Sequence, residues 1–140
     1  MRIAVIDGQG GGIGKHITEK LRKELGEDVD ILALATNALA TSLMLKAGAN
    51  EGASGENAIL YNCRRVDLIV GPVGIIVPNA LLGEITPGMA EAIYSSQVPK
   101  ILLPILRGGI ELVGLQGEPL PHLIAQLVER VKEQLEKFNR

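Results

Sequence analysis

The sequence predicts an α/β protein, a three-layer sandwich in which helices cover both faces of a mainly parallel sheet. Short apolar runs alternate with amphipathic segments throughout residues 1–140, and the connections between them are short. Strands that are buried on both faces of a parallel sheet are typically continuous apolar runs, and the alternating order favours such a sheet. Right-handed crossovers then favour the strand order 3-2-1-4-5 within a single domain.

The first strand, loop and helix are the clearest elements. Ile3 to Ile6 is a wholly apolar run, and five glycines follow it within residues 8–14. Ile13, Ile17, Leu21 and Leu25 then recur every four residues, which predicts an amphipathic helix. Gly26 is a suitable C-terminal cap for that helix.

The remaining elements follow the same patterns. In chain order they are a strand over 29–35, a helix over 38–46, a short edge strand over 51–53, a helix through Cys63, a strand over 66–70, a helix opened by Thr86-Pro87, a strand over 101–106 and a long terminal helix from Leu120 to Leu135. Arg107-Gly108-Gly109 is typical of a tight turn. It predicts a C-terminal β-hairpin in which residues 110–113 return as an antiparallel edge strand.

Composition excludes several classes of protein. Aromatic residues make up 2% of the chain and the net charge is −2, so neither stacking platforms nor a basic patch for nucleic acid is expected. The single cysteine excludes an internal disulfide, and no cluster of His and Cys predicts a metal site. No apolar run reaches the length of a membrane span, which is about 18 residues. We therefore expect a cytoplasmic protein that binds neither metal, membrane nor nucleic acid.

The glycine-rich loop is the main candidate for a functional site. Glycines allow the backbone to approach a ligand closely, and the start of the following helix offers free N–H groups and a positive dipole end to a phosphate. The candidate residues here are Gly8, Gln9, Gly10, Gly11, Gly12, Ile13 and Gly14. A structural alternative is that the glycines only permit a tight turn and close packing of the helix.

Glycine spacing favours NAD or NADP as the ligand. Gly8-x-x-x-Gly12-x-Gly14 resembles the loop of the short-chain dehydrogenases, a resemblance that covers the first strand, loop and helix. The G-x-G-x-x-G pattern fails, and a P-loop fails because His16 stands where a magnesium-binding Ser or Thr belongs. A G-x-G-x-G pattern like that of methyltransferases also fits, so the ligand stays open. No catalytic residue is assigned, since neither tyrosine that could begin a Tyr-x-x-x-Lys pair, Tyr61 or Tyr94, has the lysine.

Two further segments are expected at the same edge of the sheet. Thr36 and Asn37 end the second strand, where NAD-binding proteins usually carry an acid about 20 residues beyond the loop. Gly71, Pro72 and Val73 follow the fourth strand and are expected over the sugar or second moiety of a ligand. Asp7 is expected either to contact a ligand or to accept loop N–H groups. Asn79 and Glu84 are polar residues in an apolar stretch, and either could face the site.

The whole sequence is similar to a family of short bacterial Rossmann-like proteins classed as a domain of unknown function. The segments that carry the resemblance are 3–14, 35–37, 46–50, 55–58 and 83–87. The resemblance implies the Rossmann-like fold and no particular activity.

These observations favour a protein that binds a nucleotide or another small phosphorylated ligand. Two alternatives stay open. The first is an enzyme that acts on a phosphorylated metabolite with a partner subunit, and the second is an interaction protein whose phosphate loop is vestigial. The apolar stretch 73–85 also predicts a homodimer, because exposed apolar patches mark interfaces.

Overall fold

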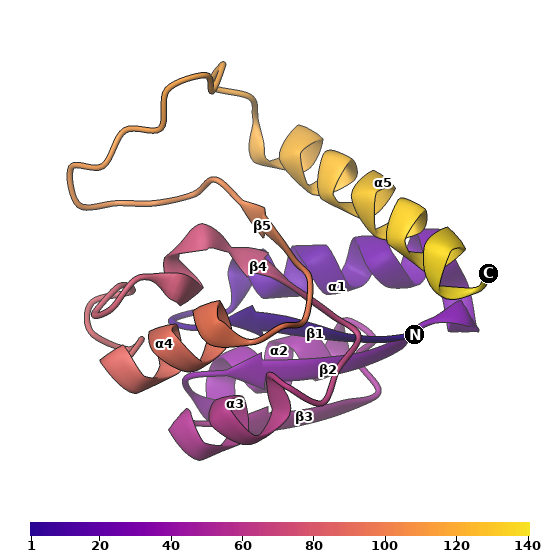
Figure 1. Ribbon diagram of the computed structural model, residues 1–140, viewed down its shortest axis with the longest axis horizontal. Helices are drawn as coiled ribbons and strands as arrows, with labels where there is room; N and C mark the ends of the chain where they lie inside the picture. Colours follow the sequence, from indigo (N-terminus) through magenta and orange to yellow (C-terminus); the bar gives the residue numbers. More distant parts are fainter.

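The computed structural model describes all 140 residues, and a five-stranded sheet in the order β3-β2-β1-β4-β5 forms its centre (Figure 1). The strands are β1 (Arg2–Asp7), β2 (Asp30–Ala35), β3 (Glu51–Ser54), β4 (Leu68–Pro72) and β5 (Lys100–Leu103). Every pairing between neighbouring strands is parallel. The predicted strand order is confirmed.

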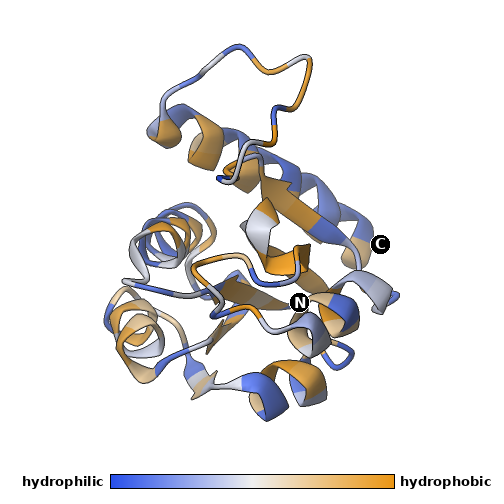
Figure 2. Cartoon of the chain, turned by 90° about the vertical axis from the view of Figure 1, so that its left-hand side faces the viewer, coloured by the Kyte–Doolittle hydropathy of each residue, from blue (hydrophilic) through white to orange (hydrophobic).

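Helices cover both faces of the sheet and complete the three layers of a Rossmann-like sandwich (Figures 1 and 2). They are α1 (Gly12–Leu25), α2 (Ala38–Lys46), α3 (Glu56–Asn62), α4 (Pro87–Ser95) and α5 (Leu120–Phe138), with 3-10 turns η1 (Gly26–Asp28) and η2 (Val73–Ile76). One face packs against α1, α2 and α5, and the other against α3, α4 and η2. None of these helices combines the length and the apolar character needed to cross a membrane.

The apolar runs in the sequence reflect burial on both faces. In β1, Ile3 and Val5 contribute to the core under α1, α2 and α5, whereas Ala4 and Ile6 contribute to the core under α3 and α4. All four side chains are fully buried. Each large aliphatic side chain buried in this way stabilises the fold by roughly 1.5–3 kcal/mol.

The predicted C-terminal hairpin is wrong. Residues 104–119 contain no strand, and this segment projects away from the body between β5 and α5 (Figure 1). Pro104 follows β5 directly, and a proline has no N–H group with which to continue a ladder. Four glycines in the segment, from Gly108 to Gly117, have positive φ between 64° and 96°, which is not strand geometry.

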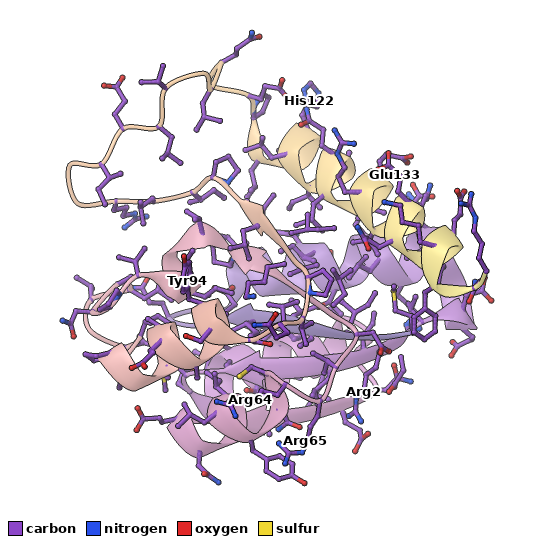
Figure 3. All side chains as sticks on the ribbon, viewed as in Figure 1. Arg2, Arg64, Arg65, Tyr94, His122 and Glu133 are labelled. Atoms are coloured by element: carbon purple, nitrogen blue, oxygen red, sulfur yellow. The ribbon has the colours of Figure 1, made fainter.

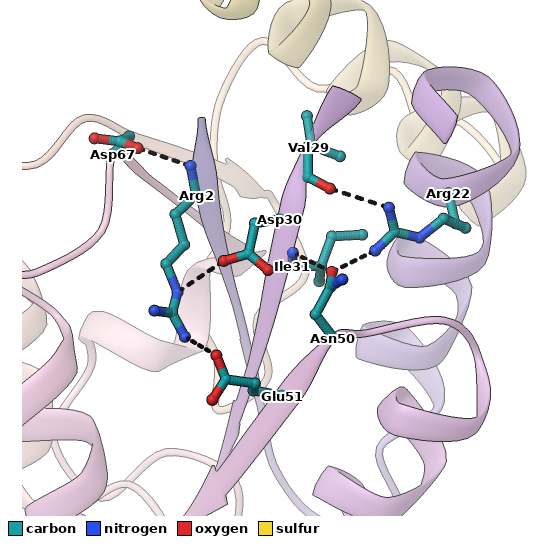
Figure 4. A network of polar contacts seen from close by, with 8 residues as sticks. All are labelled: Arg2, Arg22, Val29, Asp30, Ile31, Asn50, Glu51 and Asp67. Carbon is teal, nitrogen blue, oxygen red and sulfur yellow. Dashed lines mark hydrogen bonds and ion pairs between the residues drawn. The ribbon is translucent and has the colours of Figure 1, made fainter. Parts of the chain in front are cut away.

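Polar side chains tie the amino ends of the strands together (Figure 4). The guanidinium of Arg2, at the start of β1, lies 3.3 Å from a carboxylate oxygen of Asp30 and 3.0 Å from one of Glu51. Arg22 of α1 donates to the carbonyl oxygen of Val29, just before β2, over 3.0 Å. This edge of the sheet is therefore occupied by contacts within the protein, and the carboxyl edge is the one left for a ligand.

Candidate functional site

The glycine-rich loop lies at the carboxyl edge of the sheet, between β1 and α1. A hydrogen bond of 2.9 Å from the N–H of Gly11 to the carbonyl of Gly8 closes the turn, and α1 begins at Gly12. The strand order reverses at β1, because β2 lies on one side of it and β4 on the other. Open α/β sheets bind their ligands at such a switch point.

Packing alone accounts for three of the five loop glycines. A Cβ on Gly8 would lie 2.5 Å from Oγ1 of Thr36, and a Cβ on Gly14 would lie 2.6 Å from a methionine sulfur of α2. Gly11 has a φ of 74°, and its Cβ would lie 2.7 Å from the backbone of α2. The tight-turn reading of the loop is therefore correct for these three positions.

Gly10 and Gly12 have no such explanation. Neither has a positive φ, and a Cβ at either position would meet no heavy atom within 4 Å. Both residues are exposed. The fold would accept a side chain at both positions, so neither packing nor backbone conformation within the chain accounts for these two glycines.

The start of α1 also carries unused hydrogen-bond donors. The N–H groups of Gly10, Gly12 and Ile13 take part in no hydrogen bond within the protein. The N-cap residue, Gly11, has no side chain with which to cap the helix, and the first turn holds no acidic residue of its own. Free N–H groups and the positive dipole end are the features with which helices bind anions.

Asp7, the last residue of β1, holds the loop in its conformation. The residue is 3% exposed, and its carboxylate accepts the N–H of Gly14 over 2.7 Å. Burial raises the pKa of Asp7 above its ordinary value, and hydrogen bonds from the N–H groups of Gly14 and Gly8 oppose that rise. Of its two expected roles, Asp7 therefore performs the structural one, and its carboxylate is engaged by the loop.

The end of β2 lies beside the loop, as the sequence predicts. Asn37 is the N-cap of α2, since its Oδ1 accepts the N–H of Ala40 over 2.9 Å. Its Nδ2 donates to the carbonyl of Gln9 over 2.9 Å, which joins the end of β2 to the loop. Thr36 precedes it and directs its hydroxyl to Glu84.

Glu84 joins the loop to the end of β2, a role that the sequence does not specify. One of its carboxylate oxygens, Oε1, accepts the N–H of Gln9 over 2.9 Å, the Nδ2 of Asn37 over 2.9 Å and the hydroxyl of Thr36. The hydroxyl of Thr36 is the main cause of a pKa below the ordinary value for Glu84, and burial opposes it. The carboxylate is thus held beside both the loop and the end of β2.

The segment that delivers Glu84 is a compact turn between η2 and α4. Asn79, Leu81 and Leu82 all have φ between 55° and 66°, a conformation that non-glycine residues adopt rarely. Asn79 donates its N–H to the carbonyl of Ile85 over 2.7 Å and so closes the turn. Asn79 is exposed, and of the two polar residues in this stretch only Glu84 contacts the loop.

Gly71, Pro72 and Val73 are also at the carboxyl edge, but packing accounts for much of their arrangement. Gly71 and Pro72 are buried in the last two positions of β4. A Cβ on Gly71 would lie 2.4 Å from the carbonyl oxygen of Ile6 in the neighbouring strand. Val73 is half-buried at the start of η2. A ligand contact by these residues stays a prediction.

Other chemically distinctive residues lie away from the loop. His122 is exposed on α5, and Arg64 and Arg65 are exposed just after α3 (Figure 3). Cys63 is buried. Two surface hollows, of about 460 and 350 Å³, lie between α1 and α5. The larger is lined mainly by charged side chains, and several of these form ion pairs, for example Lys20 with Glu24. The smaller combines His16, Glu19, Lys20 and Lys23 with apolar residues at the start of α5. We therefore take the loop, rather than either hollow, as the candidate site.

The fold and this edge of the sheet define a Rossmann-like α/β protein with a glycine-rich loop at its switch point. The chain belongs to the family described as Domain of unknown function (DUF3842), whose model matches residues 2–136. This confirms the resemblance stated from the sequence. No curated protein matches the chain.

Proposed function

We propose that this protein binds a nucleotide of the NAD or NADP kind at the glycine-rich loop. The observation that carries the proposal is the pair Gly10 and Gly12, which the fold does not require to be glycine. A ligand that lies against the backbone is the physical reason for bare positions of this kind. The N–H groups of Gly10, Gly12 and Ile13 would hold its phosphates.

Two features support a dinucleotide over other phosphorylated ligands. Residues 8, 12 and 14 keep the glycine spacing of the short-chain dehydrogenases. Polar side chains at the end of β2 lie beside the loop, which is where dinucleotide sites place their ribose partner. The proposal is for binding with no reaction assigned, because Asp7 and Glu84, the acids at the loop, are both engaged in holding it.

A thermal-shift panel of NAD, NADP, FMN, ATP and S-adenosylmethionine tests the proposal. At a hundredfold excess over its dissociation constant, a ligand stabilises the fold by about 2.7 kcal/mol. For a domain of this size, that raises the melting midpoint by roughly 5–10 °C. We expect NAD or NADP to give the largest shift, and mass spectrometry of the protein as purified to detect the same compound. If no phosphate-bearing compound shifts the midpoint and none copurifies, the proposal is wrong.

A homodimer also stays a prediction, although the apolar stretch 73–85 that suggests it is less exposed than its sequence implies. Within residues 73–85, Ile75 and Ile85 are fully buried in the core. Leu82, at 96% exposure, is the large apolar side chain of this stretch that is fully open to solvent. Light scattering at micromolar concentration should give twice the mass of one chain if the dimer forms, and replacement of Leu82 by Asp should then lower that mass. The mass of a single chain at every concentration would contradict the prediction.

A further inference from the structure

The end of β2 lacks the acid that dinucleotide-binding proteins usually place there. That acid binds the ribose hydroxyls of the adenosine half, and its charge disfavours a 2′-phosphate. In this chain the corresponding positions are Thr36 and Asn37, which carry no charge. From the sequence, therefore, nothing at this position distinguishes NAD from NADP.

The fold brings a carboxylate to the same place from a different segment. Glu84 follows β4 and η2 in the chain, yet its Oε1 contacts Thr36 and Asn37 at the end of β2 and the N–H of Gln9 in the loop. Gly8 makes room for it, since a Cβ on Gly8 would lie 3.3 Å from Oε1 of Glu84. The carboxylate therefore occupies the corner between β1 and β2 where the acid of other dinucleotide sites is found.

The second oxygen of this carboxylate is free. All three donors use Oε1, and Oε2 accepts no hydrogen bond within the protein. Oε2 is also not among the buried polar atoms that lack a partner, so solvent reaches it. Glu84 forms no ion pair, and its lowered pKa keeps it ionised at neutral pH. The side chain is thus fixed by one oxygen and presents a charged acceptor with the other.

We propose that Glu84 is the ribose-binding acid of this site, and that it selects NAD over NADP. This inference rests on the proposed function. An ionised carboxylate accepts hydrogen bonds from the 2′- and 3′-hydroxyls of a ribose, whereas a 2′-phosphate brings like charges together. The same preference applies to any adenosine nucleotide that differs only at the 2′ position.

Titration calorimetry with NAD and NADP tests this inference on three proteins. These are the unmodified chain, Glu84→Gln, and Glu91→Gln as a matched control on the exposed side of α4. The unmodified chain and the control should bind NAD at least tenfold more tightly than NADP. Glu84→Gln should lose about tenfold in NAD affinity and bring the two affinities close to equal. Glutamine can still accept from Thr36 and Gln9, so the fold should be retained, and thermal unfolding without ligand checks this.

The outcomes separate the two proposals. If the unmodified chain binds neither nucleotide, the proposed function fails and this inference fails with it. If the chain binds NAD or NADP but Glu84→Gln leaves the ratio of the two affinities unchanged, only the role of Glu84 is wrong. Tighter binding of NADP than of NAD by the unmodified chain would also overturn the inference.

Discussion

Replacement of Gly10 by valine should leave the stability of this protein nearly unchanged and abolish its ligand binding. Gly10 is exposed, has no positive φ, and has open space where a side chain would project. Surface substitutions of this kind usually change the free energy of unfolding by less than about 0.5 kcal/mol, and the loss of a glycine restricts the unfolded chain. We therefore expect the free energy of unfolding of Gly10→Val to differ from that of the unmodified protein by less than about 1 kcal/mol.

The neighbouring glycine gives the contrast. In Gly11→Ala, the alanine would have to adopt a φ of 74°, and its Cβ would lie 2.7 Å from the Cα of Ala40. The left-handed conformation costs about 1–2 kcal/mol for a residue with a Cβ, and overpacking adds typically 1–3 kcal/mol. Gly11→Ala should therefore lower the free energy of unfolding by roughly 2–5 kcal/mol, although it adds a smaller side chain than Gly10→Val.

Urea unfolding followed by circular dichroism measures both changes, because the chain has no tryptophan to report by fluorescence. The thermal shift with the nucleotide that stabilises the unmodified protein measures binding. Gly10→Val should abolish that shift, since its branched side chain would stand where the backbone approaches the phosphates. If Gly10→Val is as destabilised as Gly11→Ala, Gly10 has a structural role and the main support for nucleotide binding is lost. A full thermal shift in Gly10→Val would refute the placement of the phosphates.

Other predictions concern the polar groups that hold the fold. Arg22→Lys should lower the free energy of unfolding by about 2–3 kcal/mol, because lysine cannot reach Gly26, Gly48 and Asn50 together. As a control, Arg130→Lys on the exposed face of α5 should lower it by less than about 0.5 kcal/mol. Asp7→Ala should cost about 1–3 kcal/mol, because it leaves the N–H of Gly14 without its acceptor. The pKa of Asp7 is raised in the folded protein, so its contribution to stability is present below the unfolded pKa and is lost as the pH rises through the folded value. Relative to the unmodified protein, Asp7→Asn should thus become more stable as the pH rises from about 4 towards neutrality. The pKa of Glu84 is lowered in the folded protein, so its contribution to stability is lost as the pH falls through the folded pKa. Glu84→Gln should therefore be less stable than the unmodified protein near neutral pH, and this difference should shrink as the pH falls. Urea unfolding at a series of pH values checks both, and parallel pH profiles for the two variants would contradict them.

The strand order could be predicted because local patterns and general rules of connection determine it. Each buried strand is a short apolar run, and Ile3 to Ile6 lie wholly in the core. The boundaries differ by two or three residues: the strand predicted over 66–70 is Leu68–Pro72, and the one predicted over 101–106 ends at Leu103. The hairpin failed for a different reason. Residues 110–113 have a strand-like composition, but glycines on both sides and Pro104 prevent a return to the sheet.

The candidate site divides into a local part and a long-range part, and only the local part could be predicted. The loop, the start of α1 and the contact with Asn37 follow from glycine spacing and from the meeting of strand ends at one edge of a sheet. Sequence alone could not separate the glycines that packing requires from Gly10 and Gly12, because the difference depends on how closely α2 and Thr36 approach each glycine. The position of Glu84 depends on a turn in which three non-glycine residues have positive φ, a feature that no pattern in the stretch specifies. In the sequence, the acid missing from the end of β2 and the acid in residues 73–85 are two separate observations. In the fold, hydrogen bonds from Thr36 and Asn37 to Glu84 bring that acid to the end of β2.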